Sequence, residues 1–233
     1  MLLLWRAELA YEKDASGSTP LHYAASDDDV AVVQKILDRA PLAVYIRDEE
    51  GSSPLHVAAR MCHYSTINSM IDRYPDSFEL RDNQGRNFLH IVAQHGWRIN
   101  SLALISPLMA QYCRRISSLA QRISPLMAQR GNRHGWRKLA KRINLDCQGL
   151  KILVNERDNE GNTPLHWASM NGTSDMIMEL FEVNKADTTV INNEGKTALD
   201  HSISLDSAFL MVISKLLYNL PVHQDIINYR HPS

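Results

Sequence analysis

Residues 48–59 read DEEGSSPLHVAA, and residues 14–25 have the same pattern in DASGSTPLHYAA. Three looser copies follow: DNQGRNFLHIVA at 82–93, DNEGNTPLHWAS at 158–169 and NNEGKTALDHS at 192–202. The glycines that the copies share are spaced by 34, 34, 76 and 34 residues. A fixed period of this length is typical of stacked repeats, so we expect one structural unit per copy.

Each residue type in the pattern has a local physical role. Asp or Asn followed three residues later by Gly predicts a tight turn, because Gly adopts positive φ without steric cost. Ser or Thr then suits a helix N-cap, and Pro suits the first helical position, which needs no N–H donor. The turn glycines and N-caps expected from this pattern are Gly17, Thr19, Gly51, Ser53, Gly85, Gly161, Thr163 and Gly195.

A short helix with small residues follows each N-cap, and a second helix is predicted after it. Apolar residues recur there with the spacing of one helical stripe. They are Val32, Val33, Ile36 and Leu37, then Ile67, Met70 and Ile71, and later Met176, Ile177, Leu180 and Phe181. Units of this kind bury their apolar faces only by stacking. The sequence therefore predicts an all-α solenoid of helix–turn–helix units with hairpin-like turns.

The T-P-L-H-x-A-A string and its register resemble those of ankyrin-repeat proteins, over residues 14–96 and 155–217. More narrowly, GSSPLHVAAR, RDNQGRNFLH and NEGNTPLHWA are similar to a plant group with a C-terminal PGG membrane domain, linked to defence, cell death and stress signalling. The resemblance implies protein–protein binding without catalysis, cofactor or small-molecule substrate. It also implies that the recurring histidines are structural and tie each N-cap to the next turn: His22, His56, His90 and His166.

Partners of this family usually contact the turn tips and the exposed ends of the first helices. Several tips are acidic here, which favours a basic partner surface. Carried over by position, the expected partner surface is Glu49, Glu50, Ser52, Arg60, Met61, Asn83, Gln84, Arg86, Asn159, Glu160, Asn162, Met170, Asn193, Glu194 and Lys196.

The repeat register divides the chain. Residues 1–13 are expected to form a partial leading repeat, with residues 2–10 at the end of a second helix. Repeats then occupy 14–96 and 155–217, with an insert at 97–133, the rest of the third repeat at 134–154 and a tail at 218–233. Two duplications indicate the insert: HGWR at 95–98 and 134–137, and ISPLMAQ at 105–111 and 123–129. Longer loops add little closure entropy, so we expect the solenoid to continue past it.

The net charge of −1 conceals an asymmetry, because residues 95–145 contain ten basic residues and no acidic one. This segment supports an alternative function, the binding of nucleic acid or an anionic membrane. A solvated duplication without a selected role, or a segment packed against the acidic remainder, are the other interpretations. The residues that carry the alternative are Arg114, Arg115, Arg122, Arg130, Arg137, Lys138, Lys141 and Arg142.

Catalytic and metal-binding motifs are absent from the sequence, including H-E-x-x-H and G-x-S-x-G. The three cysteines lie far apart, which favours a reducing, cytoplasmic compartment. No window reaches the roughly 18 apolar residues that span a bilayer, and no Pro-Gly-Gly occurs. A further alternative is therefore a truncated relative that competes with membrane-anchored homologues.

The residue after each first helix is usually Gly in this family, but Asp28 and Cys62 occupy two of these positions. If Cys62 keeps the left-handed backbone of the family, its strain is about 1 kcal/mol. We therefore expect Cys62→Gly to stabilise the protein.

Overall fold

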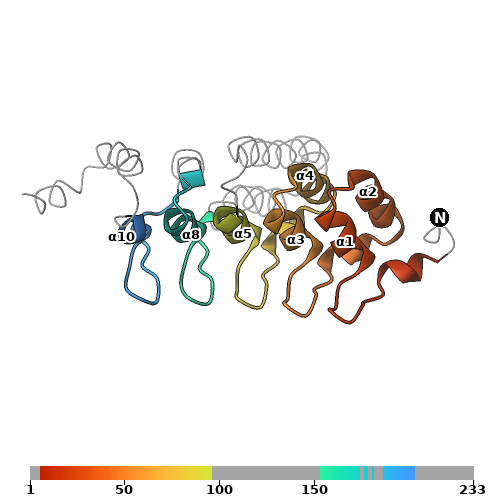
Figure 1. Cartoon of the computed structure of the whole chain (residues 1–233), viewed down its shortest axis with the longest axis horizontal. Helices are drawn as coiled ribbons and strands as arrows, with labels where there is room; N and C mark the ends of the chain where they lie inside the picture. Colours follow the sequence, from red (N-terminus) through yellow and green to blue (C-terminus); the bar gives the residue numbers. More distant parts are fainter. Residues whose placement is uncertain (1–5, 96–152, 174–175, 178–179, 181–185, 203–233) are drawn as a thin grey trace, which may run out of the picture.

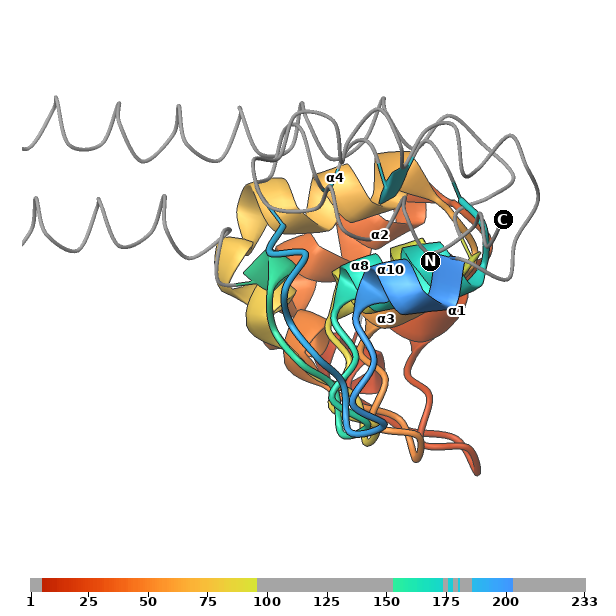
Figure 2. The ribbon, with the colours of Figure 1, turned by 90° about the vertical axis from the view of Figure 1, so that its left-hand side faces the viewer.

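The computed structural model describes residues 6–95, 153–173, 176–177, 180 and 186–202. Within these ranges it contains seven α-helices and no strand, which confirms the predicted all-α solenoid. The first helices of the units lie in a row, and the turns before them project to the same side (Figure 1). Viewed along the row, the turns lie over one another (Figure 2).

Several expectations fall outside the described residues. They include the leading residues 1–5, the basic insert at 97–133, residues 134–152 and the tail at 218–233. Phe181 also lies outside them. So do the basic residues of the alternative function: Arg114, Arg115, Arg122, Arg130, Arg137, Lys138, Lys141 and Arg142.

The first helix of each unit begins directly after its turn. The N-caps Thr19, Ser53 and Thr163 have extended backbones, and a Pro follows each at the first helical position. Ala25 and Ala59 are fully buried, and small side chains allow neighbouring helices to pack closely. Each first helix packs on the next. These helices are α1 (Pro20–Ser26), α3 (Pro54–Arg60), α5 (Phe88–His95), α8 (Pro164–Met170) and α10 (Ala198–Ser202).

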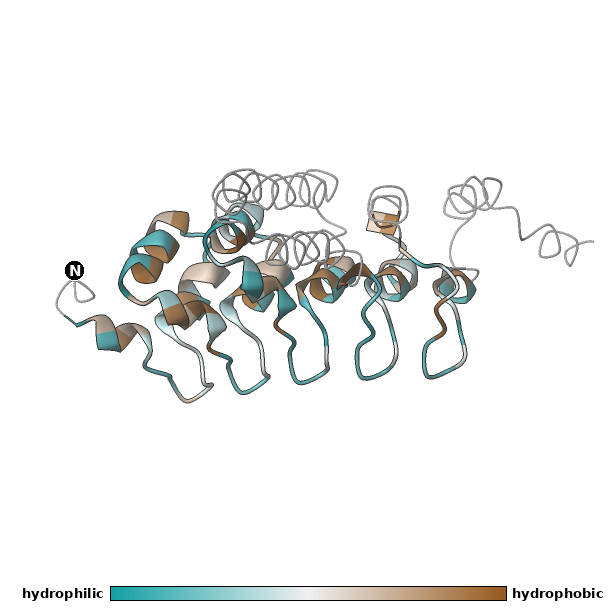
Figure 3. Ribbon diagram, turned by 180° about the vertical axis from the view of Figure 1, so that it is seen from behind, coloured by the Kyte–Doolittle hydropathy of each residue, from teal (hydrophilic) through white to brown (hydrophobic). Residues whose placement is uncertain are grey.

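Second helices form a layer behind the first. They are α2 (Val30–Arg39) and α4 (Tyr64–Arg73). Their predicted stripes are buried except for Val32, which is partly buried, and each fully buried Leu, Ile or Met stabilises the fold by about 1.5–3 kcal/mol. The projecting turns are mostly hydrophilic or neutral, and strongly hydrophobic residues concentrate on the helices (Figure 3). The buried stripe residues are Val33, Ile36, Leu37, Ile67, Met70, Ile71, Met176, Ile177 and Leu180.

A 3₁₀ segment recurs at the repeat period and was not predicted. Its copies are η2 (Ala7–Ala10), η3 (Pro41–Tyr45) and η4 (Pro75–Glu79). The assignment of residues 2–10 to the end of a second helix is therefore wrong for residues 7–10, because they align with η3, which follows α2. Pro at the start of η3 and η4 stops the α-helix before it, whereas η2 begins without a Pro.

The row of first helices continues across the 76-residue spacing between Gly85 and Gly161. Helix α5 packs directly on α8, and Asn159 N–H donates to the carbonyl of Gln84 at 2.9 Å. Val154, just before the fourth turn, is fully buried. The described units on both sides therefore form one stack.

Asp28 and Cys62 have positive φ, at 56° and 58°, and are the non-glycine residues in the described ranges that do. The left-handed backbone expected at Cys62 is confirmed. Its side chain is nevertheless buried, with Sγ 3.6 Å from the carbonyl oxygen of His95. Replacement of Cys62 by Gly thus removes backbone strain and a packing contact together.

A comparison of Cys62→Gly with Cys62→Ala separates these two effects. Both variants lose the thiol contact, but only Gly removes the Cβ atom from a left-handed backbone, where it costs about 1 kcal/mol. We expect Cys62→Gly to be more stable than Cys62→Ala by about 1 kcal/mol in urea unfolding, the reverse of the order inside a helix. A more stable alanine variant, or equal stability, would show that residue 62 is not strained.

Candidate protein-interaction surface

Each turn is closed by the side chain of its first residue. Asp82 Oδ1 accepts from the backbone N–H groups of Gln84 and Arg86, both at 2.9 Å. In the last turn the amide oxygen of Asn192 takes this role and accepts from Lys196 N–H at 3.0 Å. The turn therefore keeps its shape with either an aspartate or an asparagine at its start.

A ladder of hydrogen bonds joins the tips of neighbouring turns. Asn83 donates from its backbone N–H to the carbonyl of Glu50 at 3.1 Å and from Nδ2 to the carbonyl of Glu49 at 2.9 Å. Asn159 and Asn193 make the same pair of bonds to the turns before them. The tips thus form one continuous strip.

The recurring histidines lie in a buried row behind this strip. His56 Nε2 lies 3.0 Å from the carbonyl oxygen of Arg86. A carbonyl only accepts, so Nε2 carries the proton, and Nδ1 accepts from the hydroxyl of Ser53 at 2.8 Å. His22 and His166 are bonded in the same way. Each ring joins the N-cap of its helix to the next turn.

The third unit differs because its N-cap is Asn87. His90 Nε2 donates to the carbonyls of Glu156 and Asn162, both at 3.1 Å. His90 Nδ1 accepts from the backbone N–H of Asn87 at 3.2 Å. Asn87 Oδ1 also lies 2.7 Å from this nitrogen, but an amide oxygen has no proton to donate to it. Asn87 Nδ2 donates instead to the carbonyl of Leu153 at 3.1 Å. This side chain therefore links the units on either side of the long spacing.

Burial lowers the pKa of all four recurring histidines, and this desolvation is the largest influence on each. For His56 it lowers the pKa to about 4, although the hydrogen bond to the carbonyl of Arg86 acts in the opposite direction. The rings are therefore neutral at neutral pH. Protonation would turn Nδ1 into a donor that faces the N–H group of the N-cap.

Most of the expected partner surface is accessible, and we call its accessible residues the turn–helix face. Arg60, Arg86 and Met170 are partly buried, and the others are exposed. The exposed members are Glu49, Glu50, Met61, Asn83, Gln84, Asn159, Glu160, Asn193, Glu194 and Lys196.

The expected partner surface is wrong at Ser52 and Asn162, because these residues are only 0% and 2% exposed. Both follow the turn glycine, and their side chains are used inside the protein. Ser52 Oγ accepts from Arg60 at 3.0 Å, and Asn162 Oδ1 accepts from Asn192 at 2.9 Å. The equivalent Lys196 is exposed, so the position alone does not decide burial.

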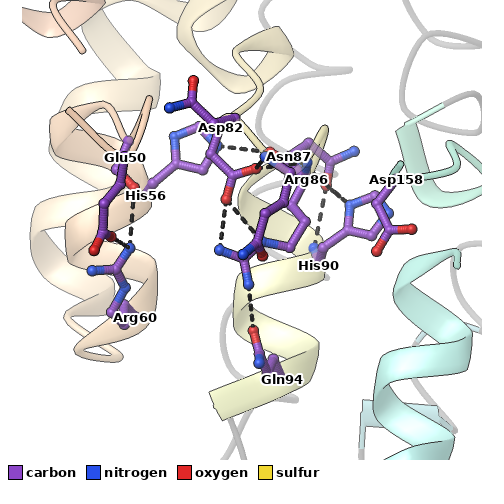
Figure 4. Close-up of polar contacts among 12 residues, drawn as sticks. Glu50, His56, Arg60, Asp82, Arg86, Asn87, His90, Gln94 and Asp158 are labelled. Atoms are coloured by element: carbon purple, nitrogen blue, oxygen red, sulfur yellow. Dashed lines mark hydrogen bonds and ion pairs between the residues drawn. The ribbon is translucent and has the colours of Figure 1, made fainter. Parts of the chain in front are cut away.

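Ion pairs cross the turn–helix face between tips and helices (Figure 4). Arg60, at the end of α3, reaches back to Glu50 at 3.3 Å. In the next unit Arg86 lies in the turn itself. Its guanidinium pairs with Asp82 at 2.7 Å and donates to Gln94 on α5 at 2.9 Å. These cations are thus already engaged within the protein.

Sequence reasoning did not single out Tyr23 and Trp167, which add aromatic rings beside the turns. Tyr23 is 56% exposed, and its hydroxyl donates to the carboxylate of Asp14. Trp167 Nε1 donates to Asp158 Oδ2 at 2.8 Å. Each directly follows a recurring histidine in the sequence. Because the histidine is buried, the residue after it is expected to face outward, and this pattern could have identified both rings.

Among the described residues, no group of three or more His, Cys, Asp and Glu side chains is arranged to hold a metal ion. Nor does any helix in this part of the chain have the length and apolar character that a bilayer crossing requires. The chemistry available on the turn–helix face is hydrogen bonding, charge and apolar contact.

Two segments, residues 2–77 and 124–225, match the family model described as ankyrin repeats (3 copies), and together they cover more than half of the chain. The chain is also similar to the transcription factor MBP1 of Kluyveromyces lactis, at 46% identity over 48 residues, which is 21% of this chain and 6% of that protein. It is 25% identical over 115 residues to oxysterol-binding protein homolog 1 of Saccharomyces cerevisiae, which is 49% of this chain and 9% of that protein. The chain thus spans less than a tenth of either relative.

The buried histidines predict a loss of stability in mild acid. Histidine in an unfolded chain titrates near 6.5, whereas the pKa of folded His56 is about 4. The unfolded state binds more protons between these values, so the free energy of unfolding falls as the pH decreases from about 6.5 towards 4. Above about pH 6.5 the titration of this ring does not change the free energy of unfolding. For His56 the loss at pH 4 is on the order of 3 kcal/mol.

His56→Gln is the control for this prediction, because Gln at the third helical position can also accept from the N-cap N–H but does not titrate. Urea unfolding of both proteins between pH 7 and pH 4.5 measures the difference. We expect a weaker pH dependence in the variant. Identical pH dependence in both proteins would mean that folding does not lower the pKa of His56.

Proposed function

This chain belongs to the ankyrin-repeat family, and we propose that it is a non-catalytic binding module whose partner protein contacts the turn–helix face. Ankyrin repeats generally mediate protein–protein interaction and are typically non-enzymatic. The observation that carries the proposal is the ladder that joins the turn tips through Asn83, Asn159 and Asn193. Such a strip is ordered before a partner arrives, which lowers the entropic cost of binding.

The charges of the turn–helix face favour a basic partner surface. Its cations Arg60, Arg86 and Lys196 already pair with acidic side chains of the protein. The exposed Glu49 side chain has no ion pair or hydrogen bond within the described residues. Acidic groups are therefore the charges left for a partner, and complementary charge adds specificity and association rate.

The biological setting in this proposal is plant defence or stress signalling in the cytoplasm, and it rests on the strings GSSPLHVAAR, RDNQGRNFLH and NEGNTPLHWA. The transcription factor and the oxysterol-binding protein share only a short segment with this chain, so their activities are not assigned to it.

A second candidate function is favoured by the ten basic residues of 95–145. A segment of this composition attracts nucleic acid or acidic lipid, and such binding weakens steeply with salt. The stacked units then serve as its scaffold.

Reversing the charge of two tips tests the first candidate. Glu49→Lys combined with Glu160→Lys changes two exposed side chains that the ladder does not use. We expect the double variant of the full chain to retain its protein partners at least about tenfold less well than wild type in quantitative pull-down, because it repels a basic surface.

Asp76→Lys with Glu79→Lys is the control, since it makes a charge change of the same size and sign at exposed positions of η4. Equal retention by both double variants, with unchanged thermal melts, would contradict the assignment of the turn–helix face. Deleting residues 97–133 separates the two candidates. It leaves protein retention intact under the first and abolishes salt-sensitive binding to RNA or anionic vesicles under the second.

A further inference from the structure

The aspartates that begin the turns have two carboxylate oxygens with different uses. One oxygen closes the turn by accepting from backbone N–H groups. In three turns the other oxygen accepts from a side chain of the same unit, so the carboxylate is fully engaged within the protein. These pairs are Asp14 with Tyr23, Asp82 with Arg86, and Asp158 with Trp167.

Asp48 is different. Its Oδ1 accepts from Ser52 N–H at 2.8 Å, but its Oδ2 has no hydrogen-bond partner within the described residues. The residue nine positions later, where Tyr23 and Trp167 supply a donor in their units, is Val57. The Asp48 side chain is only partly buried. An oxygen of this carboxylate, beside Glu49 of the turn–helix face, is therefore open to a donor from outside.

No cation within the described residues pairs with this oxygen. Arg60, in the same unit, is engaged by Glu50 at 3.3 Å and by Ser52 at 3.0 Å. Arg47 precedes Asp48 in the chain but makes no ion pair within the described residues. Lys13 donates to the carbonyl of Arg47 at 2.7 Å and does not pair with Asp48. The next residue, Glu49, is also exposed and without an ion pair in the described part of the chain.

Exposed apolar side chains lie on the first helices of this unit and the one before it. Tyr23 on α1 is 56% exposed, and Met61 at the end of α3 is 48% exposed. An aromatic ring and a thioether both suit the alkyl stem of a long cationic side chain or a neighbouring apolar residue. The turn that Asp48 begins and the first helices beside it thus offer both a charged oxygen and apolar side chains.

We infer that Asp48 Oδ2 accepts a charge-assisted hydrogen bond from a lysine or arginine of the partner, and that an apolar residue next to this cation packs on Tyr23 or Met61. The inference rests on the proposed function and names the chemistry of the bound segment. Lysine and arginine carry only donors, which is what an open carboxylate oxygen requires. Hydrogen bonds between charged groups are roughly twice as strong as neutral ones.

The chain itself supplies a conservative variant. Asn192 begins the fifth turn, and its amide oxygen accepts from Lys196 N–H at 3.0 Å. Asp48→Asn should therefore keep the turn and remove the charge. Asp14→Asn is the matched control one turn away, because Tyr23 already occupies the carboxylate there. Thermal melts of both variants establish that they remain folded.

The probe is a phage-displayed library of random peptides, selected on the full wild-type chain. Peptides whose binding is lost with Glu49→Lys and Glu160→Lys are then synthesised and measured by fluorescence anisotropy. We expect enrichment of Lys or Arg next to an apolar residue. Asp48→Asn should weaken the dissociation constant about tenfold, and Asp14→Asn less than about twofold. Replacing the peptide cation by Gln should cause the same loss, with no further loss when it is combined with Asp48→Asn.

Two results would overturn the inference and leave the proposed function standing. One is equal affinity of wild type and Asp48→Asn for these peptides. The other is an equal loss in both Asn variants, which would mean that only the net charge of the surface attracts cations. Failure of the proposed function is distinguishable, because then no selected peptide would respond to Glu49→Lys and Glu160→Lys, and this result overturns both.

Discussion

The glycines of the first four turns lie directly against the next turn, and a side chain in their place would collide with it. A Cβ atom added to Gly51 would lie 2.6 Å from the backbone N of Asn83, and one added to Gly161 would lie 2.8 Å from that of Asn193. Both glycines also have positive φ, at 77° and 80°. Only glycine satisfies both conditions at low cost, and this close approach brings the asparagine side chains within reach of the preceding turn.

The other features of the stack follow from this approach. Each buried histidine has a carbonyl of the next turn within hydrogen-bond distance, so the first helices are joined to the ladder as well as to each other. The same spacing is kept where the sequence period is broken, and Asn87 bonds to Leu153 across the break. A rigid strip results, on which most charged groups are paired internally and the carboxylate of Asp48 is not.

The sequence predicted those features that a residue determines through its own backbone and its near neighbours. Turn glycines, N-caps, proline at the first helical position and the left-handed backbone of Cys62 belong to this class. Features that depend on the residues facing a position in space were missed. Ser52 is covered by Arg60, although the same position is exposed at Lys196. The open oxygen of Asp48 becomes visible only when the side chains around every turn are compared.

Unfolding of Gly51→Ala and Gly195→Ala tests most directly whether contact between turns holds the stack together. Both glycines have positive φ, at 77° and 74°, so alanine costs each about 1 kcal/mol in backbone strain. Within the described residues a Cβ atom on Gly195 meets nothing closer than 4 Å, whereas one on Gly51 meets the next turn. We predict that Gly51→Ala is less stable than Gly195→Ala by about 2 kcal/mol and loses hydrogen-exchange protection at the Asn83 amide. Equal destabilisation, with that amide still protected, would contradict the account.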